Sequence, residues 1–156
     1  MTTTLTRKEA IDTIEFAYSQ FFSDLPIKDG EIQTIAYAVN NDLQIRDFVL
    51  GLPATYGMFN SIDFVNYLVS RVEEKDSFAF NTVLALYNIE IENFYKASEL
   101  LTKSEDVNPG YNLTKLAKRI ISAGWEGSAL TTMRNELHKQ VLEIILDEPN
   151  YAIGEI

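Results

Sequence analysis

NPGYNL, residues Asn108 to Leu113, is echoed near the C-terminus by EPNYAI, Glu148 to Ile153, and both stretches read polar-Pro-x-Tyr-x-aliphatic. Each stretch comes after an amphipathic run. The pair is therefore a structural repeat, a shared helix stop or a coincidence. A repeat would predict a superhelical array that binds peptides along one face, whereas a shared stop predicts a single compact bundle.

The residues upstream of the two prolines favour a shared helix stop. Pro109 and Pro149 lie 40 positions apart, so a repeat of that period would also set Ala97 against Leu137. That match is poor, and no third copy exists, although helical arrays need at least three units to cover their faces. Proline cannot continue a helix, and we expect the Tyr and the aliphatic residue behind it to pack back on the preceding turn. A two-unit helical-hairpin array in the C-terminal half stays open as the alternative.

Apolar residues recur at three- and four-residue spacing almost throughout the chain, which indicates an all-α fold. The capping box from Thr6 to Glu9 predicts a first helix over about residues 7–23, and a second is expected over about 29–40. Asp42 is expected to cap a third helix over residues 43–50. Further apolar stripes cover 62–72, 80–87, 94–101, 113–121 and 130–145. About eight short helices predict one compact orthogonal or antiparallel bundle, a single domain over residues 1–156.

Turn and capping signals separate the later helices. Asn60 or Ser61 is expected to cap the helix after the irregular segment 54–60, and Asp76 the next one. The run Ile89-Glu-Ile-Glu-Asn93 alternates like a strand, but no second strong strand candidate exists to pair with it, so we interpret it as a helix-to-helix turn. Gly124 is expected to end one helix, and Gly127-Ser128 to open the last.

Composition is that of a folded domain. Of the 156 residues, 46% are hydrophobic and 23% charged, which is too apolar for a disordered chain. Apolar runs fall short of the about 20 residues that cross a bilayer, so no membrane partner is expected. MTTTLTRKEA lacks the apolar core of a signal peptide, and the absence of cysteine removes disulfides and thiolate sites. We therefore expect a cytoplasmic protein.

The net charge of −10 comes from 23 acidic and 13 basic residues. It argues against direct nucleic-acid binding, because affinity for phosphates comes from neutralising them with Lys and Arg. Lys115, Lys118 and Arg119 form the nearest approach to a basic cluster, and we interpret them as the solvated flank of a helix.

Catalytic signals are weak. His138 is the only histidine, and we expect it at the surface because no nucleophile or metal partner accompanies it. The acidic pairs Glu73-Glu74, Glu90 with Glu92, and Glu105-Asp106 lack the spacing of known helical or loop metal sites and are interpreted as solvated faces. No glycine-rich phosphate loop occurs. The sequence therefore predicts no catalytic, cofactor-binding or metal-binding residue, and no cofactor.

Aromatic residues in two irregular segments are the candidate interaction surface. Tyr56, Met58 and Phe59 lie in ATYGMFN, which we expect to be a loop, and Trp125 lies in the turn AGWEGS. Exposed aromatic side chains at turns are good anchors for protein interfaces. The alternative is that these side chains fill gaps between helix ends in the core.

Several segments together resemble an uncharacterised actinobacterial family, domain-of-unknown-function family four-one-nine-two. The similar segments are IRDFVL (45–50), the helix at 79–87, residues 97–101, NPGYNL (108–113) and AGW (123–125). They span about residues 42–134. Family members carry Gly-Asp-Gly where Ile91-Glu92-Asn93 stands here, Asp in place of Asn108, and a longer N-terminal portion. The resemblance implies helical packing and a bacterial or phage origin, and the family has no assigned activity.

Three classes of function fit these observations. The leading hypothesis is a non-enzymatic protein-protein interaction or adaptor module that binds a protein partner or itself. The second is an acidic DNA mimic or inhibitor of bacterial or phage origin, which would need one continuous acidic face. The third is an enzyme with an unrecognised carboxylate site.

Overall fold

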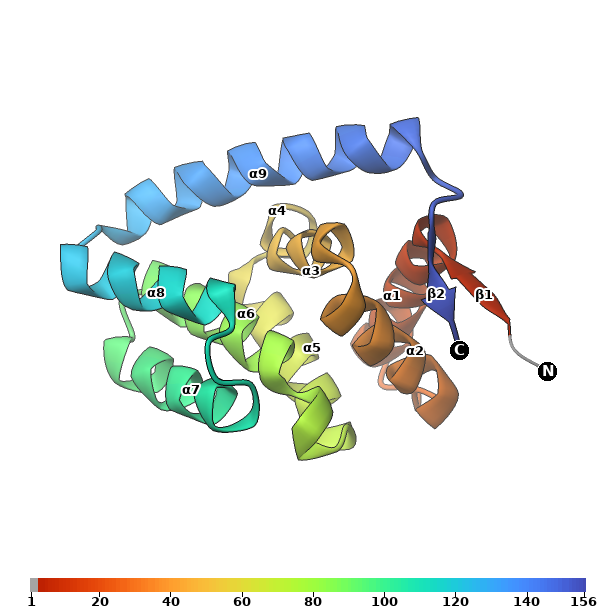
Figure 1. Ribbon diagram of the computed structural model, residues 1–156, viewed down its shortest axis with the longest axis horizontal. Coiled ribbons are helices and arrows are strands. Elements are labelled where there is room, and N and C mark those ends of the chain that lie inside the picture. The colour runs from red at the N-terminus through yellow and green to blue at the C-terminus, as the bar shows by residue number, and fades with distance from the viewer. Residues whose placement is uncertain (1–2) are drawn as a thin grey trace.

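A computed structural model of the protein describes residues 3–156 and is built almost entirely of helices (Figure 1). This confirms the predicted compact all-α fold with about eight helices. In chain order the elements are β1 (Thr4–Thr6), α1 (Arg7–Phe22), α2 (Asp29–Asn41), α3 (Leu43–Leu50), α4 (Pro53–Tyr56), α5 (Met58–Arg71), the 3-10 turn η1 (Glu74–Asp76), α6 (Phe78–Glu90), α7 (Phe94–Val107), α8 (Asn112–Ala123), α9 (Gly127–Asp147) and β2 (Ala152–Glu155).

Several helix ends agree with the predicted capping signals. The capping box is present: the Thr6 side chain caps α1, and the Glu9 carboxylate accepts a hydrogen bond from the Thr6 backbone N–H at 3.2 Å. Asp42 caps α3 by accepting a hydrogen bond from the Ile45 backbone N–H at 3.3 Å. Gly124 ends α8 in the left-handed conformation, with φ of 70°. These ends are set by contacts within four residues, which is why sequence patterns located them.

The predicted loop over residues 54–60 is wrong. The segment is helical on both sides of Gly57, whose φ of 87° separates α4 from α5. Neither Asn60 nor Ser61 caps α5, because Ser61 lies inside the helix and its hydroxyl donates to the Gly57 carbonyl at 2.7 Å. A four-residue helix is shorter than two turns and shows no apolar period, so the sequence pattern could not reveal it.

The predicted cap of α6 is also wrong. Asp76 belongs to η1, and the capping position is held by Ser77. The Ser77 hydroxyl donates to the Glu74 carbonyl at 2.6 Å rather than capping a backbone N–H of α6. The turn between α6 and α7, by contrast, lies where Ile89-Glu-Ile-Glu-Asn93 predicted it.

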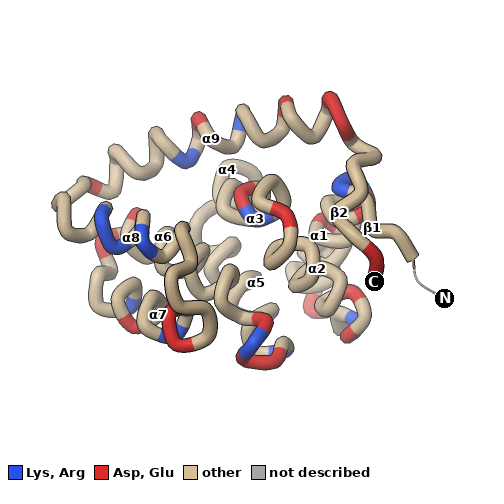
Figure 2. Tube along the Cα trace, in the orientation of Figure 1, with Lys and Arg blue, Asp and Glu red and all other residues tan. Residues whose placement is uncertain are grey.

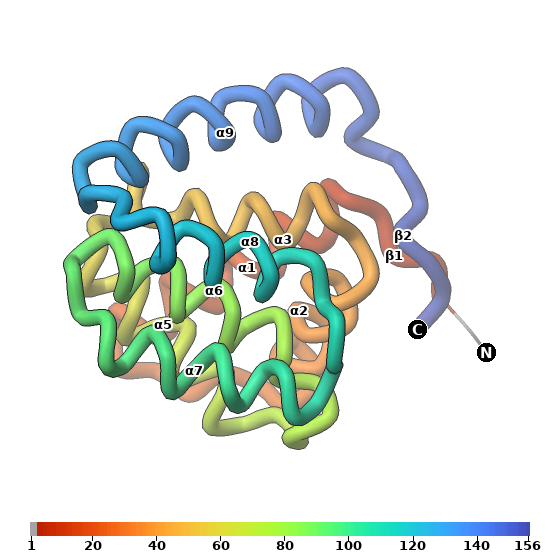
Figure 3. The backbone as a smooth tube through the Cα atoms, turned by 60° about the vertical axis from the view of Figure 1, so that its left-hand side comes forward, coloured from red at the N-terminus to blue at the C-terminus, as the bar shows by residue number. Residues whose placement is uncertain are grey.

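The two chain ends described by the structure form a short antiparallel sheet that the sequence did not predict. Leu5 of β1 pairs with Gly154 of β2, and a bulge separates this pair from Thr6. Figures 1 and 3 both show the two strands side by side at one end of the molecule. Strands of three and four residues carry too few alternations to be recognised, and their pairing depends on the whole fold.

The echo between NPGYNL and EPNYAI is resolved by the different elements that come after the two prolines. Pro109 lies in a connection between two helices, whereas Pro149 lies between α9 and a strand. Both are helix stops, as predicted, and the repeat alternative is wrong. The Tyr151 ring, which we expected to pack on its own helix, lies 3.8 Å from the guanidinium carbon of Arg7 in α1.

Helix α6 is the centre of the core and is buried on all sides from Ala79 to Ile89. The hydroxyl of Tyr87 is fully enclosed and donates to the Val49 carbonyl of α3. Desolvation of this phenol raises the pKa of Tyr87. A buried Tyr requires such a partner, so this bond ties α6 to α3.

Three hydroxyl groups join α6 to α7 and α8. Thr82 lies 2.8 Å from the Ser104 oxygen and 3.0 Å from the Thr114 oxygen, and the Ser104 hydroxyl donates to the Phe78 carbonyl at 3.0 Å. All three side chains are buried. Small polar residues let the helix backbones approach closely while satisfying each other's hydrogen bonds.

The last long helix, α9, crosses over α3 and α6 along one side of the bundle (Figures 1 and 3). Its first residue, Gly127, lies against the carbonyl oxygen of Glu90, and a Cβ atom there would collide with that oxygen. Glycine therefore allows α9 to begin directly on the end of α6. No helix in residues 3–156 combines the length and apolar character that crossing a membrane requires.

Candidate functional site

The four residues predicted as an interaction surface divide between two places. Tyr56 ends α4, Met58 opens α5 and packs against the core, and Phe59 is 71% exposed. Trp125 is 41% exposed beside Gly124 and lines a shallow hollow with residues of the α6–α7 and α8–α9 connections. No residue of α4 or α5 lines that hollow in the described chain. The candidates therefore do not form one surface.

Tyr56 belongs to an aromatic patch formed by Tyr18, Phe22 and Tyr56. The rings of Tyr56 and Tyr18 stack with centroids 3.5 Å apart, and Phe22, whose side chain is 69% exposed, stacks on Tyr18 at 6.1 Å. Burial raises the pKa of Tyr56, with smaller contributions from Glu15 and Tyr18. Tyr56 thus rests on α1, partly in the core and partly at the surface.

A groove between α1 and α9 lies farther along the same helix. We call it the α1/α9 groove, and it has a volume of about 250 Å³. Its apolar walls are Ile11, Phe48, Leu142, Ile145, Leu146 and Pro149. Leu142 is 37% exposed and Leu146 is 79% exposed. Lys8, Asp12 and Glu15 of α1 form the polar rim.

The groove and the aromatic patch share one face of α1. Ile11, Glu15, Tyr18 and Phe22 succeed each other at spacings of three and four residues, so their side chains lie along one side of the helix. Glu15 contributes to both, since it lines the groove and acts on the pKa of Tyr56. Between the groove and the exposed Phe22, this face carries the charged Glu15 and the buried Tyr18. The groove and the aromatic patch are therefore two apolar areas on one side of α1.

The surroundings of the α1/α9 groove are acidic. Asp12 forms an ion pair at 3.0 Å with Lys8, the basic residue of the groove rim, so this basic residue is already engaged. Glu15 has no ion pair among the described residues. On α9, Glu143 and Asp147 are exposed, and the chain contains no Lys or Arg after Lys139. Figure 2 shows acidic residues at the end of α9 that leads to β2, with basic residues from the start of α1 below them. The C-terminal end of a helix adds a partial negative charge of its own.

Acidic and basic residues alternate on other elements. Glu99 of α7 pairs with Lys96 at 3.2 Å and with Lys103 at 3.7 Å, and Glu105 pairs with Lys118 of α8. In Figure 2 both signs occur together on α7 and on η1. The part of the chain that the structure describes thus carries its acids in several separated groups.

A second cavity lies beneath the first half of α9, and we call it the α9 cavity. It has a volume of about 220 Å³ and is bounded by α3, α6, α8 and α9. Its apolar walls are Leu50, Leu86, Leu113, Leu130, Met133 and Leu137, with the half-exposed Leu116 beside them. Four charged side chains also line it, as two Arg–carboxylate pairs.

The first pair, Arg134 with Glu90, is joined by two parallel hydrogen bonds. Arg134 donates from Nε to Glu90 Oε2 at 2.8 Å and from Nη2 to Oε1 at 2.9 Å, and its Nη1 reaches the Asn135 oxygen at 3.3 Å. Glu90 Oε1 also accepts from the Thr131 hydroxyl. The two charged side chains are only 8% and 6% exposed. The prediction of a solvated acidic face at Glu90 is therefore wrong, because its partner lies on a distant helix.

The second pair, Arg46 with Asp47, is only partly engaged. Arg46 Nε donates to Asp47 Oδ1 at 2.9 Å, and Nη1 donates to the Tyr111 hydroxyl at 3.3 Å. Burial raises the pKa of Asp47, and the attraction of Arg46 only partly offsets this shift. Both residues belong to the IRDF stretch, and the sequence contains no signal that distinguishes this pair from surface charges.

His138 is not the surface residue predicted. It is half-buried between α9 and α3, its ring centroid lies 6.2 Å from that of Phe48, and its Nδ1 atom is buried without a hydrogen-bond partner in residues 3–156. Gly51 provides the space, since a Cβ atom there would collide with the imidazole. Burial lowers the pKa of His138, and the nearby Arg134 lowers it further.

We expect His138 to make stability depend on mildly acidic pH. Its pKa in the folded state lies below the ordinary value of 6.5, so the unfolded chain binds the proton more readily. This contribution to stability is complete above pH 6.5 and is lost as the pH falls through that value toward the folded-state pKa. Urea unfolding at about pH 7.5 and about pH 5.5 should show a larger loss in the natural protein than in His138→Gln. Equal losses in the two proteins would contradict the assignment.

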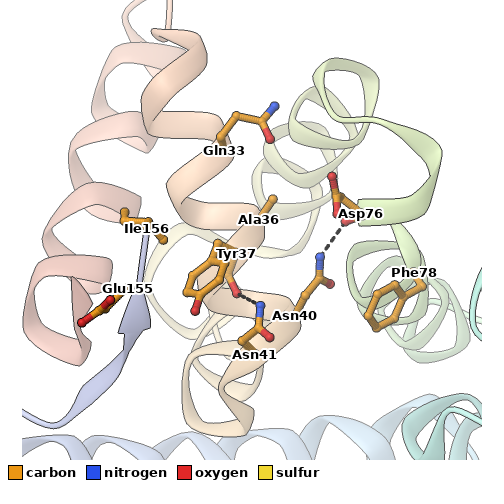
Figure 4. Close-up of a pocket in the computed structure, with 9 residues that line it drawn as sticks. All are labelled: Gln33, Ala36, Tyr37, Asn40, Asn41, Asp76, Phe78, Glu155 and Ile156. Atoms are coloured by element: carbon orange, nitrogen blue, oxygen red, sulfur yellow. Dashed lines mark hydrogen bonds between the residues drawn. The ribbon is translucent and has the colours of Figure 1, made fainter. Parts of the chain in front are cut away.

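A third hollow, of about 520 Å³, lies between α2, η1 and the end of β2 (Figure 4). Asn40 donates to the Asp76 carbonyl at 2.9 Å, and Asn41 donates to the Tyr37 carbonyl at 2.8 Å. Asn40 Oδ1 has no hydrogen-bond partner among residues 3–156 but is buried, so a ligand in the hollow does not reach it. Tyr37 of α2 lies close to Gly154 of β2, so this hollow lies where the helix packs against the strand.

The acidic side chains of the described residues do not gather into a metal-binding group. Residues 3–156 contain no cluster of three or more His, Asp or Glu side chains arranged to hold a metal ion. Among the acidic pairs of the sequence, Glu90 is held by Arg134, Glu105 by Lys118 and Glu73 by Lys75.

Comparison with known proteins adds no relative. No family model matches the chain, and no curated protein or solved structure matches it either. The resemblance to domain-of-unknown-function family four-one-nine-two therefore stays a prediction.

Proposed function

We propose that this protein is a non-enzymatic interaction module whose α1/α9 groove receives an amphipathic helix of a partner protein with basic residues beside its apolar face. The observation that carries this proposal is the exposed apolar stripe formed by Leu142 and Leu146 over a floor of Ile11, Phe48 and Ile145. Two helices with a furrow between them suit a third helix, whose apolar residues at three- and four-residue spacing fill the furrow.

The charges around the groove support a basic partner rather than a second copy. Two copies would bring together chains of net charge −10 and place the acidic end of α9 against like charges. A partner with Lys or Arg beside its apolar stripe would instead meet Asp12, Glu15, Glu143 and Asp147. Electrostatic complementarity of this kind raises association rates and suppresses wrong partners.

The aromatic patch extends the proposed surface at the other end of α1. Phe22 is strongly exposed and Tyr56 is half-buried, and aromatic residues often carry much of an interface's binding energy. Phe59, at the start of α5, and Phe16, in α1, are also strongly exposed aromatic residues. Trp125 lies outside the proposed surface, so we expect Trp125→Ala to leave partner binding unchanged.

A synthetic helix of about 14 Leu and Lys residues, about 21 Å long, tests the proposal. We expect it to bind the natural protein and to bind Leu146→Asp at least tenfold more weakly, because an apolar anchor becomes charged. Leu43→Asp is the matched control, since Leu43 is 62% exposed and does not line the groove. Both variants add one negative charge, so a loss confined to Leu146→Asp cannot come from electrostatics with a basic peptide.

Three outcomes would count against this assignment. A scrambled peptide that binds equally well would mean attraction of opposite charges without a groove. Equal loss in Leu43→Asp would mean that the site lies elsewhere. A doubled mass in light scattering that Leu146→Asp abolishes would assign the groove to a second copy of the chain instead.

The remaining parts of the proposal rest on the sequence. We place the protein in a reducing cytoplasm because it has no cysteine, and we expect no direct nucleic-acid binding because of its negative charge. The resemblance to the uncharacterised family supports a bacterial or phage origin. The separated acidic groups in Figure 2 favour an interaction module over a DNA mimic.

A further inference from the structure

We propose that the α9 cavity is a binding site for a small organic acid with an apolar body and a single carboxylate head. This inference is independent of the α1/α9 groove. The cavity is lined by the first half of α9, at Leu130, Met133 and Leu137, whereas the groove is lined by the second half, at Leu142 and Leu146.

The apolar walls of the α9 cavity define the body of the ligand. Leucine and methionine side chains come from α3, α6, α8 and α9, so the lining is apolar on several sides. An apolar cavity of about 150 Å³ holds one benzene ring. The volume of about 220 Å³ therefore accommodates roughly nine non-hydrogen atoms. Met133 adds a flexible, polarizable side chain that adapts to ligand shape.

Arg46 defines the head group. A guanidinium has five N–H donors, of which one is used by Asp47 and one by Tyr111, leaving three without a partner among the described residues. The Nη2 atom is accessible and has no hydrogen-bond partner in the described part of the chain. The planar fork of a guanidinium suits a carboxylate, which can accept two parallel hydrogen bonds.

The other charged groups in the cavity wall are less suited to bind the head group of a ligand. Both oxygens of Glu90 accept from Arg134, and Oε1 also accepts from Thr131, so this pair is a fixed polar wall. Asp47 has one oxygen, Oδ2, without a hydrogen bond in residues 3–156 and is the rival site for a cationic head. Three free N–H donors against one free oxygen favour an acid over an amine. The burial that disfavours ionisation of Asp47 adds to this preference.

Heptanoate, heptylamine and heptanol separate these possibilities, since they share an apolar chain and differ in head group. The natural protein carries methionines at 58 and 133 that methyl NMR can resolve. We expect heptanoate to shift the Met133 methyl signal in a saturable way and to leave Met58, which does not line the cavity, in place. Heptanol should bind at least tenfold more weakly than heptanoate, and heptylamine more weakly still.

Two variants locate the site. Arg46→Gln should weaken heptanoate binding at least tenfold and leave heptanol binding unchanged, with circular dichroism as the check on folding. Leu116→Trp, at a half-exposed position beside the cavity, should block all three ligands. Leu146→Asp should leave the heptanoate response intact, because the groove is a separate site.

The ligand series on the natural protein decides the matter even if Arg46→Gln fails to fold. An unchanged Met133 signal with millimolar heptanoate would overturn the proposal. Equal binding of heptylamine or heptanol would overturn the carboxylate assignment, since the cavity would then select only for an apolar chain.

Discussion

Glu90→Gln is expected to lower the free energy of unfolding by about 3–5 kcal/mol, because it leaves the Arg134 guanidinium buried without a counter-charge. The two side chains are 6% and 8% exposed and share two hydrogen bonds of 2.8 and 2.9 Å. Urea unfolding monitored by circular dichroism measures the loss. Because the pair joins the end of α6 to α9, we also expect faster hydrogen exchange in α9.

The exposed pair Lys8–Asp12 is the control for the Glu90 prediction. Its side chains are 63% and 60% exposed, and Asp12→Asn should cost about 0–1 kcal/mol. Replacing both buried partners, as Glu90→Leu with Arg134→Met, should recover most of the loss, since the unpaired charge disappears. A cost below about 1 kcal/mol for Glu90→Gln would show that water reaches Arg134 and that α9 does not seal the pair.

Asp42→Ala is expected to have a similarly large effect, about 3–5 kcal/mol, because Asp42 holds a buried charge and a helix cap together. Its carboxylate accepts from Arg7 Nε at 3.0 Å, from Arg7 Nη2 at 2.9 Å and from the Ile45 backbone N–H. Arg7 also lies against the Tyr151 ring. Losing Asp42 therefore loosens α1, α3 and the segment that leads to β2 at once.

Asp42→Asn separates the two contributions of this residue. An Asn side chain still caps a helix but no longer neutralises Arg7, so Asp42→Asn should retain about 1 kcal/mol more stability than Asp42→Ala. Hydrogen exchange at the backbone of Leu5 and Gly154 should quicken in both variants, because β1 and β2 are anchored next to Arg7. Protected strand amides in a destabilised Asp42→Ala would contradict this coupling.

The exposure and contacts of the candidate surface residues could not be predicted from the sequence. ATYGMFN has no period, which is typical of a loop, but Gly57 divides it between two helices. Tyr56 stacks on Tyr18, which lies 38 positions earlier in the chain, and no local pattern encodes that contact. The sequence also does not indicate that Leu142 and Leu146 are exposed. An apolar residue at helical spacing in α9 fits the same pattern whether or not another helix covers it.

The sequence by itself determined the all-α class and many helix ends, as at Thr6, Asp42 and Gly124. Those features depend on contacts between residues within about four positions of each other, and such contacts can be predicted from the residue types and their spacing. Only the tertiary structure decided the partners of buried charges, such as Arg7 with Asp42 across 35 positions and Arg134 with Glu90 across 44. It also decided the α9 cavity and the strand pairing, because each depends on how separate helices pack, and packing brings together residues whose sequence spacing carries no period.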